Sequence, residues 1–324
     1  MNEHRSEPSL AERSLALLKR TAPWAIAASI LWLLFRRIPF TEALTAASQA
    51  ELRVFIPAAL IAVTLWFWLE SGAFAYLFSR FNAPLSWGEA RSLRGLTYLL
   101  TPINWNLGTG AIVLHLRQSK RVAPIEATSS LLFYGLIDGV VLMGLAIVGV
   151  AALPPSPPIN MVRWIASVLL AVQSTLLVFF LLRGPQWRWV QRIKAVRVFK
   201  THSNAVWRDV AVLLSIRLTY FAGFILFFWA GTRAFGVAVP LPHLAAAVPI
   251  ILMIGGLPIT PAGLGTQQAA MLYFFSPYGS DADILAFGLA FPVSLILSRL
   301  PISVLYLRDL AALRASQSVA SSAE

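Results

Sequence analysis

Four charged side chains fall within otherwise apolar runs of this 324-residue sequence: Glu70, Asp138, Arg217 and Arg299. A charge near the bilayer centre costs about 2.5–3.5 kcal/mol on insertion scales, so such residues usually have a partner or a function. Arginines that face a polar groove would bind an anionic head group, with Glu70 or Asp138 as the counter-charge or proton site. Alternatively, the four residues pair with one another as fixed bridges between helices. The sequence leaves both interpretations open.

Two segments interrupted by Gly and Pro supply the other candidate polar groups. The substrate-binding candidates there are Asn104, Asn106, Gly263, Gly265, Thr266, Gln267 and Gln268. If a short helix begins at the second turn, its free backbone N–H groups would favour an anion. Alternatively, these side chains only satisfy the hydrogen bonds of an interrupted backbone.

The composition is that of a membrane protein, since 58% of the residues are hydrophobic and only 12% are charged. A bilayer core of about 30 Å needs about 20 apolar residues per helix. The predicted spans are residues 22–35, 54–79, 127–152, 160–182, 209–232 and 283–307. We therefore expect an all-α polytopic protein with a single membrane domain over residues 22–307, between tails at 1–21 and 308–324.

The first predicted span resembles the apolar core of a signal peptide, but Arg36 and Arg37 follow it directly and no convincing cleavage site appears. It is therefore predicted to be a retained helix.

The distribution of Lys and Arg predicts the orientation of the chain. The loops at 80–94, 117–121 and 183–208 are basic, whereas those at 153–158 and 276–283 contain no Lys or Arg. Basic loops stay on the cytoplasmic side of a membrane. The sequence therefore predicts a bacterial-type plasma (inner) membrane protein with both termini in the cytoplasm.

Two apolar segments, 95–116 and 244–275, do not fit this scheme of spans, because each begins and ends on the same predicted side. We expect both to be re-entrant helical hairpins, with their irregular backbone lining protein or a cavity.

The hairpins share a short sequence. Pro-Ile at 102–103 and Leu-Gly-Thr at 107–109 recur as Pro-Ile at 258–259 and Leu-Gly-Thr at 264–266. This predicts an inverted repeat of about residues 54–152 and 209–307, with a binding site near the bilayer midplane. Alternatively, both segments are kinked helices that pack closely through glycine.

Other classes of function find little support. The net charge of +12 is placed beside apolar runs, which favours lipid head groups over nucleic acid. The sequence has no cysteine, and its four histidines show no metal-ligand spacing, so we expect no metal and no cofactor. It contains no nucleophile turn and no Walker loop, so we expect no enzyme activity. Asp281 and Asp283 leave one alternative open, a metal-dependent enzyme acting on lipid-linked diphosphates, although capping of a helix explains them better.

The stretch from Gly255 to Thr266, together with Ser298-Arg299-Leu300-Pro301, resembles the lysylphosphatidylglycerol synthase transmembrane-region, or flippase-like, family. Family members often have Arg-Glu after the Gly-Leu-Gly turn, where this chain has Gln267 and Gln268. The first half also lacks the arginine that often accompanies the helix of Asp138.

The resemblance implies a translocase of lipids or lipid-linked substrates, facilitated or ion-coupled, whose partners are anionic or lipid-linked membrane lipids. Because the sequence ends at Glu324, we expect only the membrane part, without an aminoacyl-transferase domain. Two alternatives remain open: an intramembrane glycosyl-transfer enzyme acting on lipid-linked sugars, and an accessory scaffold subunit of envelope lipid biosynthesis.

Overall fold

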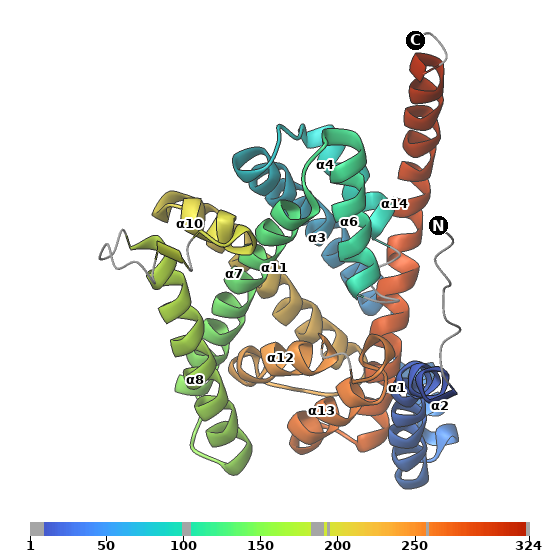
Figure 1. Cartoon of the computed structure of the whole chain (residues 1–324). Coiled ribbons are helices and arrows are strands. Elements are labelled where there is room, and N and C mark those ends of the chain that lie inside the picture. Colours follow the sequence, from blue (N-terminus) through green and yellow to red (C-terminus); the bar gives the residue numbers. More distant parts are fainter. Residues whose placement is uncertain (1–9, 99–104, 183–190, 193–194, 257–258, 322–324) are drawn as a thin grey trace.

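The computed structural model describes residues 10–98, 105–182, 191–192, 195–256 and 259–321. Within these ranges, the side chains of residues 10–20, 105–107, 158, 262 and 307–321 are outside the description. The described part of the chain is helical, which confirms the predicted all-α class (Figure 1).

Five described helices are long and apolar enough to cross a membrane, by length and composition. They are α3 (Leu52–Phe81), α7 (Pro124–Ala151), α8 (Pro157–Leu181), α11 (Trp207–Ala234) and α14 (Asp281–Ser321). Three of them contain a predicted span entirely, while α7 and α8 each end one residue before the predicted end of their span. These helices could be predicted because an apolar run of this length is typical of a membrane-spanning helix.

The first predicted span lies in a bent pair of helices. The helix α1 (Leu10–Arg37) contains residues 22–35, and α2 (Phe40–Gln49) follows at an angle of 82°. Pro39 stands at the N-cap of α2, where a residue without an N–H group ends one helix and allows another to begin. Counting the bent pair as one span raises the number of candidate spans to six.

Aromatic stacking holds α3 against α11 in the centre of the bundle. The ring of Trp66 stacks on that of Phe224 with centroids 3.8 Å apart. The Trp66 indole also donates a 3.1 Å hydrogen bond from Nε1 to the backbone oxygen of Tyr220. A buried indole satisfied in this way contributes both apolar area and a fixed orientation.

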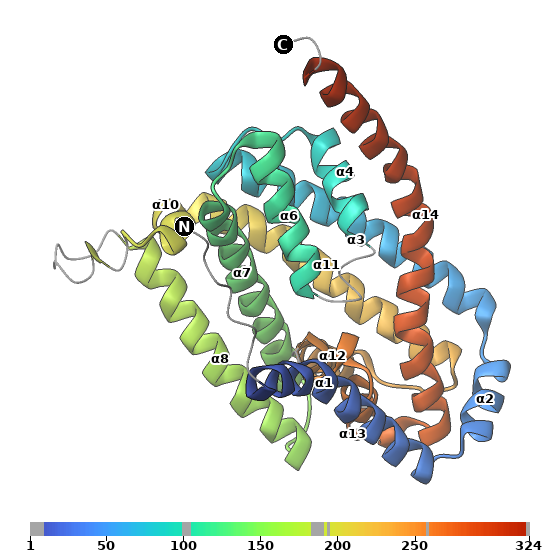
Figure 2. The same cartoon turned by 45° about the vertical axis from the view of Figure 1, so that its right-hand side comes forward.

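Small residues bring α7 close to α12 (Leu241–Gly256). A Cβ atom added to Gly149 would lie only 2.3 Å from the backbone nitrogen of Ala246, so only glycine permits this approach. On its other side α7 packs against α8, which forms one edge of the bundle (Figure 2).

The first predicted hairpin, residues 95–116, overlaps the last three residues of α4 (Trp87–Thr97) and most of α6 (Trp105–Lys120), with residues 99–104 outside the description. Most of α4 lies in the segment predicted as a basic loop. A capping box starts α4: Ser86 Oγ accepts from the Glu89 N–H, and the Glu89 carboxylate accepts from the Ser86 N–H. Both helices lie in the upper half of Figures 1 and 2.

The second predicted hairpin lies in the lower half of both views and contains α12, the short 3-10 turn η2 (Pro261–Gly263) and α13 (Thr266–Phe275). Two helices therefore occur at each predicted position, and at the second position they are separated by an irregular segment that contains η2. Their re-entry into a bilayer and their relation by an inverted repeat stay predictions.

The remaining elements are η1 (Arg197–Phe199), α10 (Lys200–Asn204) and η3 (Ser276–Tyr278). In α10, His202 is buried between the rings of Phe133, Phe180 and Phe199. Burial lowers the pKa of His202 to about 4, because a charged imidazole would lose its hydration there. This aromatic packing attaches α10 to the ends of α7 and α8.

Candidate functional site

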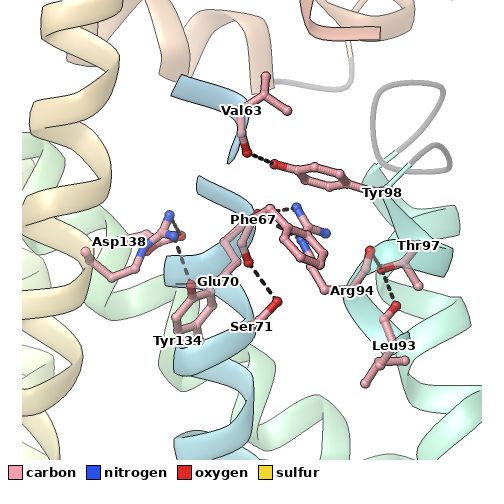
Figure 3. A network of polar contacts seen from close by, with 11 residues as sticks. Val63, Phe67, Glu70, Ser71, Leu93, Arg94, Thr97, Tyr98, Tyr134 and Asp138 are labelled. Atoms are coloured by element: carbon pink, nitrogen blue, oxygen red, sulfur yellow. Dashed lines mark hydrogen bonds and ion pairs between the residues drawn. The ribbon is translucent and has the colours of Figure 1, made fainter. Parts of the chain in front are cut away.

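A buried ion pair joins α3 to α4. The guanidinium of Arg94 donates to Oε2 of Glu70 from Nε at 2.8 Å and from Nη2 at 2.6 Å. The two side chains point toward each other between α3 and α4 (Figure 3). Glu70 is only 6% exposed and Arg94 only 4%. Glu70 therefore has a partner that the sequence analysis missed, having assigned residue 94 to a basic loop. The capping-box sequence from Ser86 to Glu89 was the available signal, because it predicts a helix that begins at residue 87 and contains Arg94.

A second buried ion pair joins α7 to α11. Arg217 donates to both carboxylate oxygens of Asp138, from Nε to Oδ1 and from Nη2 to Oδ2 at 3.0 Å. Its Nη1 donates to the hydroxyl of Tyr134 at 2.9 Å. The guanidinium also lies 3.7 Å from the ring centroid of Tyr220, an arrangement that favours a cation. All three nitrogens of Arg217 are thus engaged.

Arg299 reaches the same region from α14 but has no ion pair among the described residues. Its side chain is 7% exposed, and its Nε has no hydrogen-bond partner in the described part of the chain. The guanidinium lies 4.6 Å from the ring centroid of Tyr98, and that of Arg94 lies 4.7 Å from the same centroid. The hydroxyl of Tyr98 donates a hydrogen bond to the backbone oxygen of Val63 in α3 at 3.0 Å. This bond fixes the ring of Tyr98 beside the guanidinium groups of Arg94 and Arg299.

We call these five side chains the charged cluster: Glu70, Arg94, Asp138, Arg217 and Arg299. Three arginines face two carboxylates, so the cluster carries one surplus positive charge. A surplus charge this deeply buried raises the free energy of the folded protein unless another group compensates the charge.

A cavity of 130 Å³ lies beside the two ion pairs, between α3, α4, α6 and α7. Its lining includes Glu70, Arg94, Tyr134 and Asp138, with Thr109 contributed by α6. Sites for drug-sized ligands typically measure about 300–1,000 Å³, so this cavity is suited to a small polar group or to about four water molecules.

The second group of predicted residues forms a self-contained turn before α13. Gly263 and Gly265 have φ angles of 71° and 84°, which only glycine adopts readily. The Gly265 N–H donates to Oε1 of Gln268 at 2.7 Å, and Nε2 of Gln268 donates to the backbone oxygen of Gly288 at 2.8 Å. The hydroxyl of Thr266 donates to the Gly263 oxygen at 3.1 Å. These side chains therefore satisfy an interrupted backbone.

Helix α1 covers this turn. A Cβ atom added to Gly265 would lie 3.0 Å from the side chain of Ile30. Gln267 is 6% exposed and lies against Gly255, where an added Cβ would be 3.1 Å from its amide. The lining of the 130 Å³ cavity includes none of the predicted residues from 263 to 268.

The structure therefore separates the predicted site residues into two groups. Glu70, Asp138, Arg217 and Arg299 belong to the charged cluster, whereas Gly263, Gly265, Thr266, Gln267 and Gln268 form or adjoin the turn. Asn104 lies outside the described residues. Asn106 lies in α6, but its side chain is outside the description.

The two acids at the start of α14 have structural partners. Asp281 pairs with Arg37 of α1, with Nη2 and Oδ2 3.2 Å apart. Ser280 Oγ donates to Oδ2 of Asp283 at 2.6 Å and accepts from the Asp283 N–H at 3.1 Å. The contacts with Ser280 match the helix-capping interpretation for Asp283, whereas Asp281 forms an ion pair between two helices.

Comparison with protein-family models agrees with this layout. The model described as "Lysylphosphatidylglycerol synthase TM region" matches residues 21–296, which confirms the resemblance seen in the sequence. The match includes the candidate spans from α3 to α11 and most of the membrane part of α14, but it ends before Arg299. No curated protein matches the chain.

Proposed function

Because the chain belongs to the lysylphosphatidylglycerol synthase TM-region family, we propose that it is a translocase of lipids or lipid-linked substrates. It binds the anionic head group at the charged cluster and moves it across the membrane by a facilitated or ion-coupled route. It lies in a bacterial-type plasma (inner) membrane with both termini cytoplasmic, and its partners are membrane lipids.

The surplus charge of Arg299 is the observation that carries this proposal. A side chain that is 93% buried, with an unpartnered Nε and no described ion pair, favours the binding of a negative charge beside it. A phosphate group supplies that charge, and a guanidinium fork matches its geometry. The ring of Tyr98 lies 4.6 Å from the guanidinium and favours its charge from one side.

Enzymatic turnover of a lipid-linked substrate finds less support. The two acids that such an enzyme would use are occupied by Arg37 and by Ser280. A scaffold subunit, in turn, has no need of a surplus buried charge. We therefore propose that this protein binds and moves its lipid substrate without cleaving a covalent bond.

Reconstitution of the full chain into liposomes tests the proposal. The probes are phosphatidylglycerol and phosphatidylcholine, each labelled on an acyl chain with a fluorophore that a membrane-impermeant reductant quenches. We expect the wild-type protein to accelerate the movement of phosphatidylglycerol more than that of phosphatidylcholine. Arg299→Gln removes a charge-assisted contact of about 1.5–3 kcal/mol, so it should slow phosphatidylglycerol roughly ten- to a hundredfold.

Arg233→Gln is the matched control, because Arg233 is an exposed arginine at the end of α11. It should leave both rates unchanged. Equal acceleration of both lipids, or equal loss in both variants, would contradict the assignment of Arg299. Conversion of a sugar-linked polyprenol by the wild type, lost in Asp281→Asn, would favour the enzyme instead.

A further inference from the structure

Arg217 cannot bind a head group in the arrangement described here. Two of its nitrogens hold the carboxylate of Asp138, and the third holds the hydroxyl of Tyr134. A guanidinium binds a phosphate best through two parallel N–H donors, and the outer pair of Arg217, Nε and Nη2, is held by Asp138. The rest of the guanidinium is buried, since the side chain is 3% exposed and does not line the cavity. Any mechanism that uses this arginine must first release it from Asp138.

We propose that Asp138 is a proton-binding site, and that its protonation from the 130 Å³ cavity releases Arg217 to the anionic head group. The inference rests on the proposed function, since it assigns the coupling ion of that same site. A proton adds to one carboxylate oxygen of Asp138 and forms an O–H bond. The hydrogen bonds from Arg217 to that carboxylate weaken, and no covalent bond breaks.

The geometry favours Asp138 over Glu70 as the proton acceptor. Both carboxylates line the cavity, but the Asp138 side chain is 18% exposed and that of Glu70 is 6% exposed. Arg217 is only 3% exposed, so the cavity reaches the carboxylate and not the guanidinium. The carboxylate of Asp138 is therefore the more accessible of the two to a proton in the cavity.

Ionisable groups from four helices surround this carboxylate. Arg217 and Tyr220 belong to α11, and Tyr134 precedes Asp138 on α7 itself. Across the cavity lie Glu70 of α3 and Arg94 of α4, already paired with each other. Because Glu70 stays paired with Arg94, protonation of Asp138 weakens only the ion pair between Asp138 and Arg217.

A proton suits this cavity better than a metal cation. Each carboxylate already has a guanidinium partner, whereas a metal cation would need several free oxygen ligands at once. A proton needs one lone pair and a hydrogen-bonded path to it. Water molecules beside the hydroxyls of Thr109 and Thr128 would supply that path.

Charge balance is consistent with uptake of both ions together. The empty cluster carries one surplus positive charge, and one proton with one monoanionic head group leaves that surplus unchanged. The buried region would then have the same net charge with and without its ligands. By linkage, each ligand raises the affinity for the other to the same degree.

Binding of a short-chain phosphatidylglycerol to the purified full chain in detergent tests this inference. If only the protonated form binds, the apparent Kd should rise about tenfold per pH unit above the proton-release pH. A pH indicator in weakly buffered solution should record the uptake of close to one proton per bound lipid. This second measurement needs only the wild-type protein, so it stands even if a variant fails to fold.

Three variants locate the proton. Asp138→Asn should bind the lipid with an affinity that no longer changes with pH, whereas Asp138→Glu should keep the pH dependence. Glu89→Gln is the matched control, because Glu89 is an acid paired with Lys120 outside the cavity. It should behave like the wild type.

The outcomes separate the inference from the function. Lipid binding and translocation that are independent of pH, without proton uptake, would overturn the inference and leave the translocase intact. A response to replacing sodium by choline at constant pH, with no response to pH, would also overturn it. Absence of lipid binding and of translocation at every pH would instead overturn the proposed function.

Discussion

The two interrupted regions of this protein share a short sequence but differ in what their residues do. In the second region, Gly265 is a turn residue with a φ of 84°, and Thr266 bonds to a backbone oxygen of the same turn. The equivalent residues of the first region, Gly108 and Thr109, lie within α6 and line the charged cavity. The same Leu-Gly-Thr sequence therefore forms a turn in one place and a polar wall in the other.

The difference teaches that the glycine turn and the buried charges are located apart in this fold. The second region contains the two positive-φ glycines Gly263 and Gly265 and satisfies its backbone through Gln268. The first region adjoins the ion pairs and the cavity, which are the groups that can bind and exchange ligands. We infer that the second region supports the structure, while the first takes part in binding.

The comparison predicts its largest effect on stability at the first region. Glu70→Gln leaves the buried guanidinium of Arg94 without a counter-charge, which should lower the free energy of unfolding by about 3–5 kcal/mol. Unfolding in mixed detergent micelles, followed by circular dichroism, measures this loss. The double variant Glu70→Gln/Arg94→Met removes the orphaned charge and should regain most of the stability. A loss below about 1 kcal/mol in the single variant would show that the pair is not buried as described.

The next effect tests the backbone conformation of the second region at Gly265. Gly265→Ala places a side chain at a positive φ and against Ile30, so it should destabilise the protein by about 1–3 kcal/mol. Gly110→Ala in α6 is the control, because its added Cβ would meet no atom within 4 Å. Alanine is the better helix former, so this variant should gain about 0.5–1 kcal/mol. Shifts of opposite sign in the melting temperatures of the two variants would support the comparison, and equal shifts would contradict it.

Gln268→Ala tests whether the second turn is fixed by its own hydrogen bonds. The change leaves the Gly265 N–H and the Gly288 oxygen without their partner, which should cost about 1–3 kcal/mol in unfolding free energy. Lipid affinity of the protein that remains folded should be unchanged. Loss of affinity without loss of stability would instead place Gln268 in the binding site.

The smallest effect concerns the ion pair that joins the two helices of the first region. Lys120 Nζ lies 2.5 Å from the Glu89 carboxylate, and both side chains are partly exposed. Burial alone would raise the pKa of Glu89, but hydrogen bonds from Lys120 and Ser86 lower it overall. Its contribution is therefore complete above the ordinary pKa of a glutamate and is lost as the pH falls through the lowered value.

Lys120→Gln should remove at most about 0.5 kcal/mol, because solvent and salt screen the pair. Comparing unfolding free energies at low and high salt measures this effect. The difference between the wild type and the variant should disappear at high salt. A difference that persists would mean that the pair is shielded from solvent.

The long spans could be predicted from the sequence because hydropathy and length are local properties. Residues 209–232, for example, were predicted as a span and lie within α11. The short helix α2 was missed, because its residues 40–49 lack an apolar run long enough to predict a span. The bend of 82° before it depends on packing that the sequence does not reveal.

The cluster residues could be predicted, but not how they pair. Buried charges stand out in apolar runs, and Glu70, Asp138, Arg217 and Arg299 were found in this way. Their partners come from elements far away in the chain, so Arg217 pairs with a carboxylate 79 residues before it. Arg94 was missed because it follows other arginines in a segment that looks like an ordinary basic loop.

The contact between Ile30 and Gly265 also sets an order of events during synthesis. Gly265 leaves the ribosome roughly 235 residues after Ile30, a delay of roughly 10–50 s at about 5–20 residues per second. Helix α1 therefore lacks its contact with Gly265 while the four spanning helices from α3 to α11 are inserted. A chain truncated before residue 263 should leave this face of α1 open to lipids, chaperones or proteases.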